Sequence, residues 1–203
     1  MQERWMFEWV VSVIGGWGYP GVFALMLLEN LFPPIPSEVI MPLAGYLIAQ
    51  GKMALVPTLL AGTAGSVLGT SVWFILGAWI GAARLRRWAG RWGRWLTVAP
   101  SDIDAAQGWF DRRGGIAVFL GRMIPAVRTL ISVPAGVAGM GWLRFLGWTI
   151  LGSLLWTGLL AAAGMLLAAN WARVADVIDP LSKIVVAAVV LVYLWRVVTW
   201  RAH

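Results

Sequence analysis

Long apolar stretches alternate with short polar ones along this chain, and the apolar stretches differ in whether they are continuous. Residues 55–80, 142–168 and 181–200 are continuous apolar runs, and the first two are rich in glycine and alanine. A transmembrane helix needs about 20 residues of this kind. The pattern therefore predicts three full transmembrane helices in an all-α integral membrane protein.

The apolar run over residues 22–49 is interrupted by prolines and by two acids, Glu29 and Glu38. Prolines break a helix, and the apolar halves on either side are too short to cross a bilayer. We predict an acidic re-entrant hairpin, made of two half-helices, with both acids near its broken tip. The predicted breaks are Pro33, Pro34 and Pro36. A proline-rich loop outside the membrane, between two short spans, is the alternative.

The run over residues 116–140 is interrupted in the same way, but by basic side chains. Arg122 and Arg128 lie in it, together with the predicted breaks Pro125 and Pro134. A charged side chain at the centre of a membrane helix costs about 2.5 to 3.5 kcal/mol, so a plain lipid-facing span is not expected. We predict a basic re-entrant hairpin whose arginines point into a polar cavity. Because the guanidinium fork suits phosphate or carboxylate, an anionic ligand or an acidic partner is expected.

The polar segments between these runs predict interfacial helices and an orientation. Residues 1–14 mix charged and aromatic side chains, which predicts a short amphipathic interfacial helix that ends at the glycines 15–16. Residues 84–113 hold seven arginines against three aspartates, and a helix that starts at Ser101 is predicted to end near residues 111–115. Basic loops face the cytoplasm, so this basic amphipathic segment and the C-terminus are placed inside.

The two interrupted runs correspond to each other, and each is followed by a continuous span. Loop charge places the mouth of the first hairpin outside and that of the second inside. The predicted fold is one membrane domain over residues 1–203. It is an inverted repeat of two re-entrant helical hairpins, each followed by a full transmembrane helix, with a C-terminal transmembrane helix and interfacial helices added. Paired broken segments are a pointer to a transporter site near the bilayer midplane.

Composition agrees with a membrane protein and excludes several kinds of chemistry. The mean hydropathy is +0.78, and charged residues make up only 12% of the chain. Cysteine is absent and the single histidine is His203. Thiolate metal sites, zinc hydrolysis and Ser-His catalysis each need one of these side chains, so neither a metal nor a cofactor is expected. The net charge of +7 indicates basic loops facing the cytoplasm rather than nucleic-acid binding.

Glu29, Glu38, Arg122 and Arg128 are the ionisable residues that fall deep in the apolar runs. Inserting all four unpaired would cost on the order of 10 kcal/mol, so they are expected to be paired, solvated in a cavity, or both. Structural ion pairs that hold the hairpin tips are one interpretation. In the other, the arginines bind a phosphate group, and the acids carry protons or gate the arginines.

These residues also resemble a known family. The motifs are Glu29-Asn30, Pro33-Pro34-Ile35-Pro36-Ser37-Glu38, the glycines 65, 69, 77 and 81, and Phe119-x-x-Arg122-x-x-Pro125-x-x-Arg128 with Ala135-Gly136. Together they resemble the DedA family of bacterial inner-membrane proteins, which is related to the eukaryotic VTT proteins. The resemblance covers roughly residues 18–164, and its most specific part is the Arg-x-x-Pro-x-x-Arg element.

The resemblance implies opposed re-entrant hairpins and recycling of undecaprenyl phosphate across the inner membrane, driven by the proton motive force, with lipid scrambling in the eukaryotic relatives. It implies that the four deep charges are the essential residues. The chain departs from the family pattern after Gly69. There the family commonly has a polar or acidic residue followed by a tyrosine, and this chain has Thr70 and Trp73.

Three functions follow as hypotheses. The leading one is a flippase for a polyprenyl phosphate or a related phospholipid, with membrane lipid and protons as its partners; a homo-oligomer is compatible with it. The second is a membrane enzyme that hydrolyses a prenyl diphosphate, disfavoured because Ser37, Thr129 and Ser132 are the only hydroxyls nearby and none has a histidine partner. The third is a proton-coupled exporter of small cations or drugs, in which the arginines would be structural.

Overall fold

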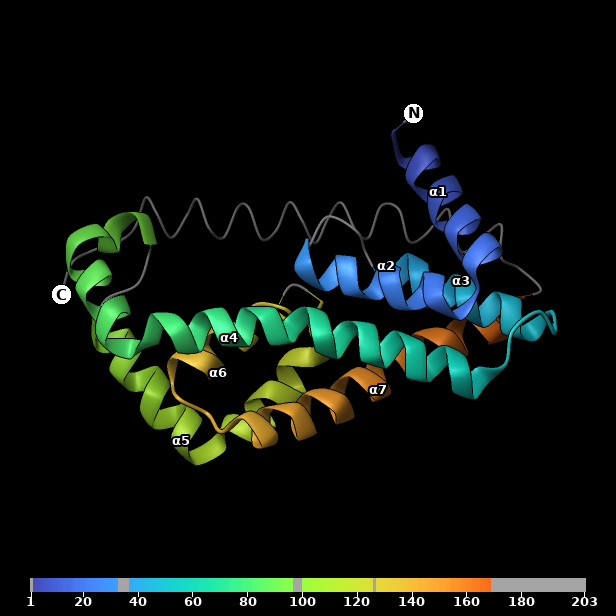
Figure 1. Cartoon of the computed structure of the whole chain (residues 1–203). Coiled ribbons are helices and arrows are strands. Elements are labelled where there is room, and N and C mark those ends of the chain that lie inside the picture. The colour runs from blue at the N-terminus through green and yellow to red at the C-terminus, as the bar shows by residue number, and fades with distance from the viewer. Residues whose placement is uncertain (1, 33–36, 97–99, 126, 169–203) are drawn as a thin grey trace. The chain divides into compact units, whose positions relative to one another are not determined.

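The part of the chain that the structure describes is all-helical, as predicted. The structure is a computed structural model, and it describes residues 2–32, 37–96, 100–125 and 127–168. The helices, shown in Figure 1, are α1 (Gln2–Trp17), α2 (Tyr19–Leu31), α3 (Ser37–Ala49), α4 (Leu55–Leu96), α5 (Pro100–Arg122), α6 (Ser132–Val137) and α7 (Trp142–Leu166).

Two helices of the described residues are long and apolar enough to cross a membrane, namely Leu55–Arg87 within α4 and all of α7. Helices α2 and α3 are also apolar but have 13 residues each. At 1.5 Å per residue each extends only about 20 Å, less than the hydrocarbon thickness of about 30 Å. The span predicted over residues 181–200 lies outside the described residues.

The chain divides into two compact units. Unit 1 holds the described residues up to Thr70 and those from Thr149 onward, and unit 2 holds those from Ser71 to Trp148. Helices α1, α2 and α3 therefore belong to unit 1, and α5 and α6 to unit 2. The first part of α4 lies in unit 1 with most of α7, whereas the rest of α4 lies in unit 2 with the start of α7.

The core of unit 1 begins with α1, which packs against α2 and α3. Val10 and Ile14 of α1 are each 1% exposed and share a cluster with Val22 and Leu25 of α2. The prediction that this first helix ends at the glycines 15–16 is wrong, because α1 continues to Trp17. The chain turns one residue later, at Gly18, whose φ of 59° is in the left-handed region that glycine tolerates.

In unit 1, α3 and α7 meet through two reciprocal glycine contacts. A Cβ atom added at Gly45 would overlap the carbonyl oxygen of Ala161, and one added at Gly164 would overlap that of Pro42. Each glycine thus lies directly on the backbone of the other helix. Small residues at such crossings let helices in a membrane approach closely.

Unit 2 contains the same contact, made by α6 on α4. A Cβ atom added at Gly136 would overlap the carbonyl oxygen of Phe74, and one added at Gly77 would overlap that of Val133. In both units the hairpin helix offers a carbonyl and, three residues later, a glycine, and the long helix offers the same pair. Beside this contact Phe74 stacks on the buried Phe145, with ring centroids 4.2 Å apart.

Helix α5 is longer than predicted. The expected helix end near residues 111–115 is wrong, since α5 runs without a break to Arg122. Gly115 lies inside this helix, at a position where an added Cβ atom would overlap the indole of Trp148. The glycine serves close packing on α7 rather than the end of a helix.

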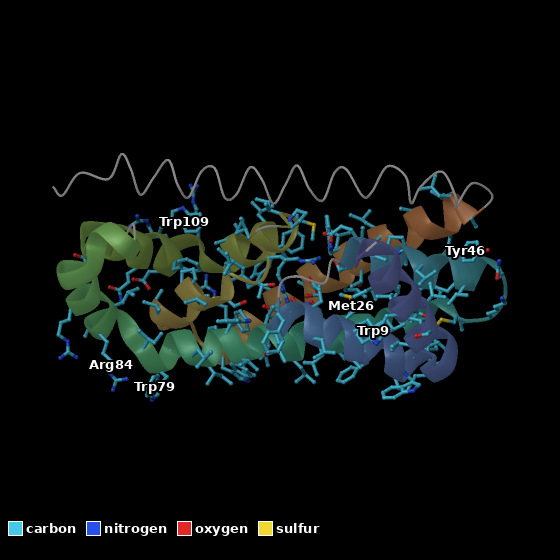
Figure 2. All side chains as sticks on the ribbon, turned by 90° about the horizontal axis from the view of Figure 1, so that it is seen from above. Trp9, Met26, Tyr46, Trp79, Arg84 and Trp109 are labelled. Carbon is cyan, nitrogen blue, oxygen red and sulfur yellow. The ribbon has the colours of Figure 1, made fainter. Side chains whose placement is uncertain are left out.

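Helix α4 changes direction where its apolar part gives way to its basic part. Gly81 has a φ of 66°, a left-handed conformation inside an otherwise right-handed helix, and Figure 1 shows α4 bending toward its C-terminal end. Just beyond it, Arg84 donates to the carbonyl of Trp79 (2.7 Å), and its guanidinium lies 5.1 Å from the centroid of the Trp79 ring. Figure 2 labels both residues on α4. Arg86 then forms an ion pair with Asp104 of α5.

Candidate functional site

The tip of the first hairpin carries a buried carboxyl group. Glu29 lies in the last turn of α2 and is 2% exposed, and its neighbour Asn30 is 1% exposed. The Nδ2 group of Asn30 donates to Glu29 Oε2 (2.6 Å) and to the carbonyl oxygen of Met26 (2.8 Å). Asn30 therefore fixes the orientation of the Glu29 side chain.

The two acids of this tip lie at opposite kinds of helix end, Glu29 at a C-terminus and Glu38 at an N-terminus. Glu29 lies near the C-terminus of α2, where the helix dipole disfavours negative charge. Glu38 lies in the first turn of α3, where the dipole favours it, and this side chain is half-buried. The two carboxyl groups therefore lie at helix ends of opposite polarity.

Helix α4 closes one side of this tip in unit 1. A Cβ atom added at Gly69 would lie 2.6 Å from Asn30 Cβ, so α2 rests directly on the α4 backbone. The next residue, Thr70, is completely buried and donates to the carbonyl oxygen of Ser66 (2.8 Å). Asn30 therefore packs on α4 at Gly69, the residue before the buried Thr70.

The tip of the second hairpin, in unit 2, brings two arginines together. Arg122 is the last residue of α5 and is 2% exposed; Arg128 lies in the turn that follows and is 7% exposed. Arg122 Nη1 donates to the carbonyl oxygen of Arg128 (3.1 Å). The chain reverses between them through backbone bonds such as Arg128 N to Ile124 O (2.9 Å).

This arrangement suits an anion. A guanidinium carries five N–H donors in a planar fork that matches phosphate and carboxylate oxygens. Two such groups are held within one tip, and the buried hydroxyl residues Thr129 and Ser132 lie in the same segment. Arg122 also sits at a helix C-terminus, where the dipole favours its positive charge.

The predicted proline breaks fall in different places. Pro125 lies in the turn between the two arginines and is exposed. Pro134 lies in the first turn of α6, where the missing N–H would have had no helical partner. Pro33, Pro34 and Pro36 lie outside the described residues. Across the described ranges, no three side chains of histidine, cysteine, aspartate or glutamate gather where they could hold a metal ion.

Asn30 is a functional candidate that the sequence reasoning did not assign. The available signal was its position, an amide directly after a carboxyl residue in an apolar helix. The acids belong to unit 1 and the arginines to unit 2.

Comparison with known proteins gives one family and several relatives. The model of the VTT domain matches residues 35–166. An "Alkaline phosphatase-like protein" of Lactococcus lactis subsp. cremoris is 40% identical over 190 residues, which cover 93% of this chain and 89% of the relative. "Undecaprenyl phosphate transporter A" of Bacillus subtilis is 30% identical over 193 residues, covering 95% and 93%.

A third relative is the inner membrane protein YghB of Escherichia coli K12. It is 35% identical over 159 residues, which cover 76% of this chain and 68% of the relative. No solved structure matches the chain.

Proposed function

The chain belongs to the VTT domain family, the DedA membrane proteins, and on this basis we propose that it transports an anionic lipid carrier across the bacterial cytoplasmic membrane. The proposal rests on the arginine pair of the second hairpin tip, Arg122 and Arg128. In an apolar protein these two side chains are only 2% and 7% exposed. The substrate we propose is undecaprenyl phosphate, which the name of the Bacillus subtilis relative gives as its cargo.

The burial of the arginines supports an anionic cargo. A guanidinium inside a membrane protein is costly unless it meets an anion, a carbonyl or water. Arg122 Nη1 donates to the carbonyl oxygen of Arg128 (3.1 Å), so the two arginines belong to one turn of the chain. A phosphate monoester offers several charged oxygens and can accept from both arginines, which suits a lipid that carries its phosphate into the membrane.

The lengths of the broken helices support re-entrant hairpins. At about 20 Å each, α2 and α3 can enter and leave on one side but cannot each cross the hydrocarbon layer. The matching glycine contacts, Gly45 with Gly164 and Gly136 with Gly77, support an internal repeat. Loop charge supports its inversion, with the first mouth outside and the second inside. Such tips let a headgroup enter the membrane while its tail remains in lipid.

We assign the acids of the first tip to proton coupling. Glu29 and Glu38 would take up and release protons as the phosphate is moved, so that the proton motive force drives the cycle. The supporting observation is the place of Glu29, which is 2% exposed at a helix C-terminus and hydrogen-bonded to Asn30.

A phosphatase is the second candidate, because the Lactococcus relative is named "Alkaline phosphatase-like protein". It would need a nucleophile or an activated water at the arginine tip. The hydroxyl group of Ser132 is buried and has no hydrogen-bond partner among the described residues, so no base activates it there. This favours transport. Phosphate release from a prenyl diphosphate by purified protein with Mg²⁺ would favour the enzyme instead.

Native mass spectrometry of the purified protein tests the proposal. We expect undecaprenyl phosphate to bind to the wild type, and undecaprenol, which lacks the phosphate, to bind much more weakly. Arg128→Ala should lose the difference between the two lipids, whereas Arg112→Ala, which removes an exposed arginine of α5, should keep it. Equal binding of both lipids to the wild type would overturn the anion site.

A further inference from the structure

Buried hydroxyl groups line the contact between α4 and α7 inside unit 1. Each of the six side chains is at most 7% exposed, and along each helix they recur every three or four residues, which puts them on one face. We call this set the hydroxyl seam: Thr63, Ser66 and Thr70 on α4, and Thr149, Ser153 and Thr157 on α7.

The hydroxyl groups of the seam face each other in pairs. Thr63 Oγ1 lies 3.3 Å from Thr157 Oγ1, and Ser66 Oγ donates to Ser153 Oγ at 3.5 Å. As the residue number rises on α4 it falls on α7, so the helices are antiparallel here. The next step in this register sets Thr70 opposite Thr149.

The hydroxyl group of Thr149, at the end of the seam, is positioned to bind a further ligand. Its side chain is completely buried, and its hydroxyl group makes no hydrogen bond within the described residues. Buried polar groups are normally bonded to the protein or to ordered water. A water molecule held between Thr149 and Thr70 would satisfy this hydroxyl and extend the row of oxygens.

The same end of the seam lies beside the acidic tip. Gly69, the residue before Thr70, touches Asn30, and Asn30 donates to the carboxyl group of Glu29. Helix α2 and helix α7 thus occupy neighbouring faces of α4. Glu29 and Glu38 are the titratable residues of this tip, and Glu29 is the one joined to Asn30.

We propose that the hydroxyl seam, with water bound at Thr149, conducts protons to Glu29. The proposal rests on the proton coupling proposed above. In each step an oxygen accepts a proton while its own proton passes to the next oxygen, and further water molecules join one pair to the next and the last hydroxyl group to Glu29. Thr70 and Thr157 donate to the carbonyl oxygens of Ser66 and Ser153, so their hydroxyl groups rotate to take part. The carboxylate of Glu29 accepts the last proton and becomes neutral; release reverses the sequence.

Proton uptake into liposomes tests the seam. The full-length protein is reconstituted with undecaprenyl phosphate, a pH gradient is imposed, and an enclosed pH-sensitive dye reports the flux. Thr149→Val keeps the side-chain shape and Ser153→Ala keeps the small size, so both remove hydroxyl groups with little change in packing. Thr149→Ser restores the hydroxyl. Thr58→Val is the matched control, because Thr58 is fully buried on α4 but lies on the face of Gly65 and Gly69, outside the seam.

We expect Thr149→Val and Ser153→Ala to lose most of the proton flux, and Thr149→Ser and Thr58→Val to keep it, with undecaprenyl phosphate binding unchanged in all four. Wild-type flux in the Val and Ala variants would overturn the seam while leaving the coupling intact. Loss of flux that Thr149→Ser does not restore would make the seam a structural contact only. A wild type that moves no protons would overturn the coupling proposal, and the seam with it.

Discussion

Asn30 donates a hydrogen bond to the buried carboxyl group of Glu29. We expect Asn30→Leu, which is similar in size but has no donor, to destabilise the protein by about 1 to 3 kcal/mol, the usual effect of leaving a buried polar group short of a hydrogen bond. The measurement is the thermal unfolding of the purified protein in detergent.

The control for this prediction is Gln50→Leu. Gln50 donates to the hydroxyl group of Tyr46 (2.6 Å), but at an exposed position where water replaces the lost bond. An equal loss of stability in both variants, or none in Asn30→Leu, would contradict the role given to Asn30.

Glu29→Gln should keep the fold, because its amide oxygen can still accept from Asn30, and should lose proton coupling.

The burial of Glu29, Arg122 and Arg128 could be predicted from the sequence, whereas the pairing of neutral hydroxyl groups could not. Glu29, Glu38, Arg122 and Arg128 stand out because each breaks an apolar run. The hydroxyl seam gives little hydropathy contrast, since serine and threonine are common in membrane helices. The pairing of these hydroxyl groups depends on which faces of α4 and α7 meet, and the sequence of neither segment shows this.

The four glycines of the reciprocal contacts are predicted to be intolerant of alanine. At each of Gly45, Gly164, Gly77 and Gly136 an added Cβ would overlap a backbone carbonyl oxygen, and a backbone atom cannot move aside as a flexible side chain can. We expect an alanine at each site to separate the hairpin helix from its long helix. Overpacking of this kind costs about 1 to 3 kcal/mol or more, measurable as a loss of folded protein in detergent.

Gly147 and Gly158 of α7 are the matched controls for the glycine series. Neither has a neighbouring atom within 4 Å of an added Cβ. Because alanine is a better helix former than glycine by about 0.5 to 1 kcal/mol, Gly147→Ala and Gly158→Ala should leave stability unchanged or raise it. If the contact glycines behave like these two, the close backbone packing in both units is wrong.

Element boundaries were the weaker part of the sequence prediction. The existence of the long apolar helices could be predicted from the length of their runs, and α4 and α7 agree with it. The ends near the glycines 15–16 and residues 111–115 were wrong, because a glycine costs a helix only about 1 kcal/mol and packing outweighs it. Gly115 shows this, since its contact with Trp148 could not be foreseen from either segment.

For the molecule as a whole, the proposed re-entrant hairpins predict a specific pattern of accessibility. The chain contains no cysteine, so single cysteines can be introduced and labelled without removing any. Trp17→Cys and Lys52→Cys flank the first hairpin at exposed positions, and Arg112→Cys and Gly141→Cys lie at the mouth of the second. In intact cells, a thiol reagent that does not cross the membrane should label the first pair and leave the second pair unlabelled.

The second pair should be labelled only after the membrane is opened, because both of its positions are expected to face the cytoplasm. If the two positions that flank one hairpin were labelled from opposite sides, that hairpin would cross the membrane and the inverted repeat would be wrong. A labelled pair at the second hairpin in intact cells would instead reverse the orientation inferred from the basic segment 84–113.

The class and the family could be predicted from the sequence because both depend on features that few other proteins share. The motifs around the paired arginines and prolines resemble those of the DedA family, and the VTT domain match over residues 35–166 confirms this resemblance. Which side chains meet across helices distant in sequence could not be predicted in this way.

Transport of undecaprenyl phosphate in liposomes tests the central claim most directly. A labelled undecaprenyl phosphate is placed in one leaflet, and its arrival in the other is followed with and without an imposed proton gradient. We predict gradient-dependent transfer by the wild type and its loss in Arg122→Lys, because lysine keeps the charge but not the planar fork that holds phosphate. Transfer by Arg122→Lys at the wild-type rate, or transfer of undecaprenol as fast as of its phosphate, would contradict a phosphate-binding role for the arginine tip.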